Sequence, residues 1–176
     1  MSIKTKLVFL FISLCLSSCV SIQSVVDNSL FSEPYKNALI LIPYEKSMTQ
    51  NFVIKIKEKL EKKFQENQTK VTFVLFERQE KELQLNNHTD YNAMINENLK
   101  KEYKDLILVF RPTVYGLNNT GGGLNYVNYE ITGIDTKTQK EVWKSKFMSQ
   151  SGFGPAFVAE DTANSIIKKL KSDKII

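Results

Sequence analysis

The run Ala38-Leu39-Ile40-Leu41-Ile42, closed by Pro43, decides the fold of this 176-residue chain. No polar residue interrupts it, which is typical of a strand buried on both faces of a sheet. Two further largely apolar runs follow, Val71 to Phe76 and Leu106 to Phe110, the latter followed by Arg111-Pro112. We therefore expect three buried strands, the third of which ends at Arg111-Pro112.

Amphipathic segments separate the three runs. Ser47-x-x-Gln50 predicts a capping box, and Asp90 is predicted to cap a second helix after a polar loop from Glu77 to His88. Strands joined by helices imply right-handed crossovers and parallel pairing. The residues expected on the apolar helix faces are Phe52, Val53, Ile56, Leu60 and Phe64 in the first helix, and Tyr91, Met94, Ile95 and Leu99, with Tyr103, in the second.

The pattern then changes to an antiparallel hairpin. Two extended runs, Leu124 to Ile134 and Val142 to Met148, flank the turn sequence from Asp135 to Lys140. Pro155 is well placed as the first residue of a last helix. Alternation in the second run predicts one side for Trp143, Ser145 and Phe147 and the other for Val142, Lys144 and Lys146. The last helix should bury Val158 or Ala159, Ala163, Ile166, Ile167 and Leu170.

These elements predict a mixed α/β fold of about five strands and three helices. The order is βαβαβ followed by an antiparallel β-hairpin and a C-terminal helix, with a single mixed sheet packed by helices. Residues 37–176 are predicted to form the single α/β domain. A chain of about 150 residues buries roughly 70% of the surface that it exposes when unfolded. It can therefore form a stable hydrophobic core without disulfide bonds or structural metal sites.

The N-terminal residues 1–18 have the layout of a signal peptide. Lys4 and Lys6 precede an apolar run from Leu7, which leads into Leu16-Ser17-Ser18-Cys19. The run is about half of the roughly twenty residues that a membrane-spanning helix needs. A plain membrane helix and an ordinary cleaved signal with an incidental thiol at Cys19 are the alternatives.

The stretch Leu16-Ser17-Ser18-Cys19 resembles the lipobox of bacterial lipoproteins. The resemblance implies cleavage before Cys19, a diacylglycerol on its sulfur, and an acyl chain such as palmitate on the new amino group. Two or more acyl chains hold a protein stably on a membrane. In the best-known sorting rule of that family an Asp after the cysteine retains the lipoprotein at the inner membrane, so Val20 favours the outer membrane, on its periplasmic face or at the cell surface.

Residues 19–36 are predicted to be the lipidated cysteine and a tether that lets the domain move away from the membrane. The segment is polar and mixed, although Val25-Val26 and Leu30-Phe31 could dock on the domain.

Charge and cysteine content limit the possible functions. Loss of Lys4 and Lys6 would lower the formal net charge from +5 to +3, and the remaining lysines mostly alternate with glutamates or lie on helix faces. Export disfavours nucleic acid as a partner. The chain has two cysteines, Cys15 and Cys19; the first would leave with the signal and the second would carry lipid. The mature domain is therefore expected to have no disulfide and no free thiol.

The hairpin sequence Asp135-x-x-Thr138-x-x-x-x-Trp143 is similar to a "D-x-x-T-G-x-x-x-W" hairpin of small envelope modules, with Gln139 in place of Gly. Those modules are the curli-secretion lipoprotein, the LpoB-type activators of penicillin-binding proteins and the amino-terminal domain of TolB. Asp and Thr side chains bond to turn amides, and the Trp packs under the sheet. The resemblance implies a docking module for another envelope component.

The sequence offers little catalytic chemistry, and we expect no cofactor and no metal site. His88 is the single histidine, and only Glu82 or Asp90 could join it as ligands. Gly121-Gly122-Gly123 lacks the Lys-Ser/Thr of a phosphate-binding loop. The glycines around Ser151 do not have the spacing of a nucleophile elbow.

Two surfaces are better candidates for binding. Tyr115, Tyr126 and Tyr129 flank the glycine-rich link from Asn118 to Gly123, and exposed tyrosines beside glycines can anchor an interface. The alternative is that these tyrosines simply cover the sheet. The second candidate is Phe153, which lies between two glycines and could present to a partner or tuck into the core.

We therefore expect a lipid-anchored, non-enzymatic binding or adaptor module for another envelope protein. One alternative is a structural subunit of an envelope secretion or assembly complex. Another is an envelope-polymer hydrolase, which would require His88, Asp90 or Glu82 to line a cleft beside Ser151 or the glycine link.

Overall fold

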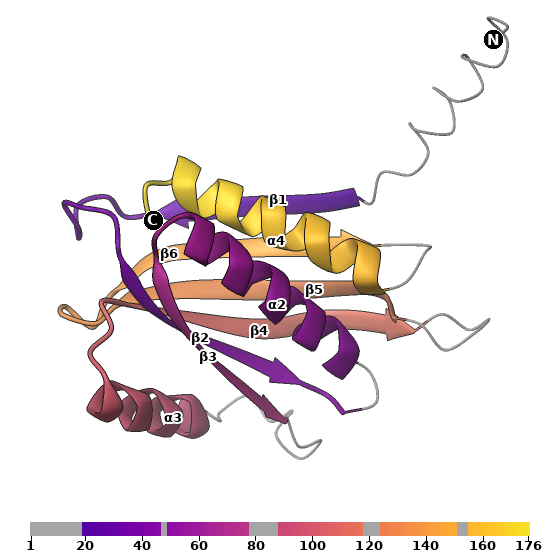
Figure 1. Ribbon diagram of the computed structural model, residues 1–176, viewed down its shortest axis with the longest axis horizontal. Helices are drawn as coiled ribbons and strands as arrows, with labels where there is room; N and C mark the ends of the chain where they lie inside the picture. Colours follow the sequence, from indigo (N-terminus) through magenta and orange to yellow (C-terminus); the bar gives the residue numbers. More distant parts are fainter. Residues whose placement is uncertain (1–18, 47–48, 78–87, 118–123, 151–154) are drawn as a thin grey trace, which may run out of the picture.

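The computed structural model describes residues 19–46, 49–77, 88–117, 124–150 and 155–176, and it confirms a mixed α/β fold with one sheet (Figure 1). The six strands of the sheet follow the order β1-β6-β5-β4-β2-β3. The elements are β1 (Cys19–Val26), β2 (Asn37–Tyr44), α2 (Gln50–Glu66), β3 (Lys70–Glu77), α3 (His88–Lys101), β4 (Leu106–Leu117), β5 (Leu124–Asp135), β6 (Glu141–Gln150) and α4 (Pro155–Ser172).

The three apolar runs form the parallel part of the sheet, as expected. β2 lies between β3 and β4 and pairs in parallel with both. The predicted hairpin is β5 and β6, which pair antiparallel with each other, and β5 pairs antiparallel with β4. The sheet is therefore mixed, with its parallel and antiparallel halves joined at β4.

Helices cover both faces of β2. Figure 1 shows α2 and α4 side by side across one face of the sheet, where Lys59 and Lys63 of α2 form ion pairs with Glu160 of α4. On the other face, α3 packs on alternate residues of β2 and β4. The whole run from Ala38 to Ile42 is excluded from solvent. This double coverage explains why the run contains no polar residue. The predicted inward residues of α2 and α4 are buried: Phe52, Val53, Ile56, Leu60, Phe64, Val158, Ala159, Ala163, Ile166, Ile167 and Leu170.

The predicted tether is wrong for its first eight residues. Cys19–Val26 forms β1, which pairs antiparallel with β6 along its whole length. Val26 packs against the core, as do Leu30 and Phe31 further along, whereas Val25 is exposed. The strand covers the backbone edge that β6 would otherwise leave unpaired. Its short alternation is too weak a signal to predict a strand without knowledge of β6.

The third apolar strand does not end at Arg111-Pro112. β4 continues through Pro112 to Leu117, and its pairing with β5 shifts register between Pro112 and Val114. The proline is tolerated because β2 pairs with β4 only as far as Val109, so Pro112 lies beyond the part of β4 that is bonded on both edges. The register shift marks a β-bulge, another position where proline is accepted.

Both predicted helix starts need adjustment. α3 begins at His88, so Asp90 is the third residue of the helix and not its cap, and His88 does not close a loop. Residues 78–87 of the predicted loop lie outside the described ranges, and so does Ser47 of the predicted capping box. The residue before α2 is Thr49, whose Oγ1 accepts a hydrogen bond from the Glu45 N–H at 2.8 Å. Within the described residues no helix is long and apolar enough to cross a membrane.

The hairpin turn is built as its sequence predicts. The Asp135 carboxylate accepts hydrogen bonds from the Thr138 N–H at 2.6 Å and from the Thr138 hydroxyl at 2.8 Å. Gln139 has a φ of 57°, a left-handed conformation that favours glycine. Trp143 is buried under the sheet. The predicted alternation of β6 is confirmed except at Val142, which is also buried because the pairing with β5 shifts register beside it.

Asp173, just after α4, connects three elements. Its carboxylate accepts hydrogen bonds from the Trp143 indole N–H at 2.8 Å and from the Ser24 hydroxyl, and it forms an ion pair with Lys169 at 3.0 Å. Desolvation opposes ionisation, but the bonds from Ser24, Trp143 and Lys169 outweigh it and hold the pKa of Asp173 below its ordinary value. The single carboxylate therefore ties β1, the hairpin and the last helix together.

Gln139→Gly should stabilise the protein. A left-handed non-glycine residue carries a steric cost, so we expect the free energy of unfolding to rise by about 0.5–1 kcal/mol in urea titration. Lys137→Gly, in the same turn but without a positive φ, is the control and should lower stability. A Gln139→Gly protein that is no more stable than Lys137→Gly would contradict the left-handed turn.

Asp173→Asn should lower the free energy of unfolding at neutral pH by about 1–2 kcal/mol, because a charged acceptor of three donors is lost. The folded pKa lies below the unfolded value of about 3.9, so this stabilisation is present above that value and is lost as pH falls through the folded pKa. Unfolding midpoints of wild type and variant, measured from pH 7 down to 3, should therefore converge at low pH.

Glu66→Gln is a matched carboxyl-to-amide control, since Glu66 is exposed and makes only a 4.0 Å ion pair with Lys62. It should change stability little at any pH. A pH-independent deficit in Asp173→Asn would argue against the ionised carboxylate as the cause.

Candidate interaction surface

The second face of the sheet, opposite α2 and α4, is exposed on β1 and β6. Alternate residues along β6 are exposed there, and the strand register places them beside exposed residues of β1 and β5. Val25 lies opposite Lys144, and Tyr126 lies opposite Gln150. We call this surface the open face; its described exposed and half-buried members are Gln23, Val25, Tyr126, Asn128, Glu130, Lys144, Lys146, Met148 and Gln150.

Large apolar side chains are exposed on the open face. Val25 is 76% exposed, Met148 55% and Tyr126 40%. Scattered single apolar residues are normal on a protein surface, but several on one sheet face mark a candidate contact surface. A depression of about 590 Å³ also lies here, lined mainly by residues of β1 and β6 with Glu130 of β5.

Charged groups share the open face with the apolar ones. Lys144 Nζ lies 3.3 Å from a carboxylate oxygen of Glu130, and about half of the Lys144 side chain is exposed. Exposed pairs of this kind contribute roughly 0–1 kcal/mol, so Lys144 can exchange this partner for another at little cost. Lys146 is also exposed on β6. The surface is therefore amphipathic, with lysines in rows next to methionine and tyrosine.

Of the residues predicted to anchor a partner, the structure places Tyr126 on the open face and Tyr129 in the core. Tyr129 is 1% exposed and stacks on Phe147 at 5.1 Å between ring centroids, so its prediction as a surface anchor is wrong. Tyr115 lies in β4 opposite Val127, and its side chain is outside the described part, as is all of Phe153.

The sequence already contains the reason for the difference. Tyr126 and Tyr129 are three residues apart in one strand, and odd spacings in a strand point to opposite faces. Once β5 is known to have one covered face, only one of the two tyrosines can be exposed. Val25 and Met148 were not predicted as surface anchors, because β1 was not predicted as a strand and because the sequence does not show which face of β6 a helix covers.

A smaller hollow of about 370 Å³ lies beside the hairpin turn, lined in part by Tyr35, Asp105 and Asp135. Its carboxylates have structural partners. Asp105 accepts hydrogen bonds from the backbone N–H groups of Lys36 and Asn37 at 3.0 and 2.9 Å. Asp135 accepts the Tyr35 hydroxyl at 3.0 Å in addition to the turn bonds. These hydrogen bonds hold the chain in place around the hairpin turn.

The pKa shifts of Asp135 and Tyr35 agree with that structural role. Desolvation alone would raise the pKa of Asp135, but the hydrogen bonds from Thr138 and Tyr35 outweigh it and keep the pKa below the ordinary value. Burial and the bond to Asp135 raise the pKa of Tyr35. Asp135 is therefore ionised and Tyr35 neutral at physiological pH, as a fixed hydrogen bond requires.

The side chains that the hydrolase hypothesis requires lie outside the described part of the structure. The described ranges contain no group of three or more His, Cys, Asp or Glu side chains that could hold a metal ion. Glu82 and Ser151 lie outside those ranges, and the side chains of His88 and Asp90 are not described.

Comparisons with known proteins show the fold. No family model matches the chain, and no curated protein matches it. Two solved structures of the PelC dodecamer from Paraburkholderia phytofirmans are similar, with 13% and 12% sequence identity and TM-scores of 0.53 and 0.52. The matches cover 89% and 90% of this chain and 99% of each PelC chain. Lipoprotein GNA1162 from Neisseria meningitidis matches with 17% identity, 77% and 98% coverage and a TM-score of 0.45.

Tyr129→Phe should stabilise the protein. Among the described residues the Tyr129 hydroxyl is buried and has no hydrogen-bond partner, so its removal relieves a desolvation penalty. We expect the free energy of unfolding to rise by about 1 kcal/mol. Tyr35→Phe, which loses the bond to Asp135, is the matched control and should lower it by a similar amount. Thermal melts that place both variants below wild type would contradict the core position derived for Tyr129.

Proposed function

We propose that this chain is a lipid-anchored envelope lipoprotein that works by binding another envelope component, without catalysis. Acyl chains on Cys19 hold it on a membrane, and Val20 after the cysteine favours the outer membrane. Confinement to a membrane raises the effective concentration of the domain near other membrane-bound proteins. The hairpin similarity to the LpoB-type activators points to the same kind of role.

One observation carries this proposal: Cys19, the cysteine of the predicted lipobox, is the first residue of β1. Leu16-Ser17-Ser18-Cys19 leads directly into β1. A secretion signal alone would require only export, whereas a lipidated Cys19 would fix the folded domain to the bilayer.

The second candidate is a structural subunit of an envelope assembly. The PelC structures that share this fold are dodecamers, and the match extends over nearly the whole of that chain. The edge strand β3 also supports a role as an assembly subunit. β3 ends the sheet order, and its residues from Val71 to Phe76 are all half-buried. An apolar edge strand can accept a strand from another copy.

The test is a crosslinking pull-down from intact cells that compares the native chain with Cys19→Ala. We expect one dominant envelope protein with the native chain and its loss with the variant, because the variant cannot be lipidated. Cys15→Ala, which leaves the lipobox intact, is the matched control and should behave like the native chain. Equal amounts of the three proteins are compared.

The remaining outcomes separate the candidates. Recovery of the chain's own copies alone would favour the assembly subunit. Recovery of the same partner with Cys19→Ala would show that the anchor is not needed. Failure to recover any specific protein with either form would contradict a binding function.

A further inference from the structure

We propose that the open face docks on the membrane surface, with Tyr126 and Met148 entering the lipid interface and Lys144 and Lys146 lying over anionic headgroups. This inference rests on the lipidation of Cys19 proposed above. It adds an orientation, because the domain lies on the bilayer by one chosen face and does not move freely on a tether.

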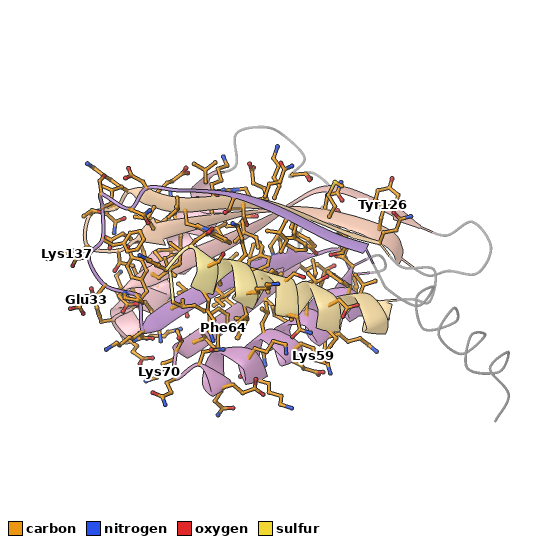
Figure 2. All side chains as sticks on the ribbon, turned by 90° about the horizontal axis from the view of Figure 1, so that it is seen from above. Glu33, Lys59, Phe64, Lys70, Tyr126 and Lys137 are labelled. Carbon is orange, nitrogen blue, oxygen red and sulfur yellow. The ribbon has the colours of Figure 1, made fainter. Side chains whose placement is uncertain are left out.

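The attachment point leaves the domain little freedom. Cys19 pairs with Gln150, and Gln150 pairs with Tyr126 on the next strand. Neighbouring strands are about 4.8 Å apart, so the backbone of Tyr126 lies roughly 10 Å from that of Cys19. Figure 2 shows Tyr126 at the end of the sheet where β1 begins. A lipid on Cys19 therefore brings this end of the sheet to the bilayer, because no linker separates the anchor from β1.

The side chains nearest that end suit a lipid interface. Tyr126 is 40% exposed, and tyrosine is enriched where a membrane meets water because its ring is apolar and its hydroxyl polar. Met148, 55% exposed, occupies the next row of the open face. A flexible thioether side chain adapts to an irregular apolar surface.

The lysines continue the same face away from the anchor. Lys146 and Lys144 occupy the two rows after Met148 on β6, both exposed. Lysine can lay its methylene stem along an apolar surface and keep its ammonium group among phosphates. Glu130 on β5 is paired with Lys144, and the exposed Glu141 at the start of β6 also lines the depression on this face. Proximity to anionic lipid would favour exchange of that weak ion pair for headgroup contacts.

The distribution of exposed apolar side chains favours this face. The described residues include five exposed large apolar side chains, of which Val25, Tyr126 and Met148 lie on the open face. The other two, Ile54 on α2 and Tyr103 after α3, lie on separate elements. Among the described residues, the face that carries the attachment strand thus has three of the five exposed large apolar side chains.

The experiment uses single thiols in the lipidated mature protein. With Cys15 removed and Cys19 modified, the mature chain has no other cysteine, so an introduced thiol can be labelled alone. Met148→Cys reports on the open face, and Lys62→Cys on α2, 76% exposed on the opposite side, is the control. Each protein carries an environment-sensitive fluorophore and is placed in vesicles of phosphatidylethanolamine and phosphatidylglycerol.

Two quenchers distinguish a label that lies at the lipid surface from one that is exposed to water. A spin label on lipid headgroups should quench the Met148→Cys label several-fold more than the Lys62→Cys label, and aqueous iodide should show the reverse order. Adding Tyr126→Ala to the Met148→Cys protein should weaken the lipid quenching, whereas Ile54→Ala should leave it unchanged. Equal lipid quenching of the two labels would overturn the docking.

Other outcomes are distinguishable. A Met148→Cys label shielded from iodide but not quenched by lipid would mean that a second copy covers the face, which also overturns the proposal. Mass spectrometry of the Cys19 peptide reads lipidation separately. A protein without lipid contradicts both the proposed anchor and the docking, whereas a lipidated protein with equally quenched labels contradicts the docking alone.

Discussion

The burial of β2 between two helical layers is the constraint on which the rest of the structure depends. Its apolar run from Ala38 to Ile42 is fully excluded from solvent, and each of its leucine and isoleucine side chains contributes roughly 1.5–3 kcal/mol. In the sheet, β3 lies on one side of β2 and β4 lies on the other. The chain therefore crosses from β2 to β3 in one direction and from β3 to β4 in the opposite direction. Because both crossovers are right-handed, this reversal places α2 and α3 on opposite faces. The buried strand and the helical layers therefore require each other.

The antiparallel half is held by polar contacts as well as by packing. Asp135 organises the hairpin turn, and Asp173 links Trp143, Ser24 and the end of α4. Both carboxylates accept several hydrogen bonds, which offsets the cost of partial burial. Through Asp173 the strand that begins at Cys19 is bonded to the last helix.

The inclusion of Cys19 in the sheet changes the functional interpretation. A tethered domain samples many orientations, whereas a domain joined to the bilayer through an edge strand presents the same surfaces to its surroundings. If the open face meets the lipid, then α2, α4 and the edge of β3 are left for proteins. An adaptor and an assembly subunit would both gain from this arrangement, because a fixed orientation lowers the entropic cost of docking.

Local sequence alone determined the parallel strands, the helix faces and the hairpin, because each carries a periodic apolar pattern or defined turn residues over several positions. It also shows that an apolar segment ending in Leu16-Ser17-Ser18 precedes Cys19. Tertiary structure alone decided that Cys19–Val26 is a strand, that β4 runs through Pro112, and that Tyr129 is core while Tyr126 is surface. The physical reason is the same in each case. The state of an edge strand, or of one strand face, depends on which backbone edge or helix lies beside it, and that neighbour comes from a distant part of the chain.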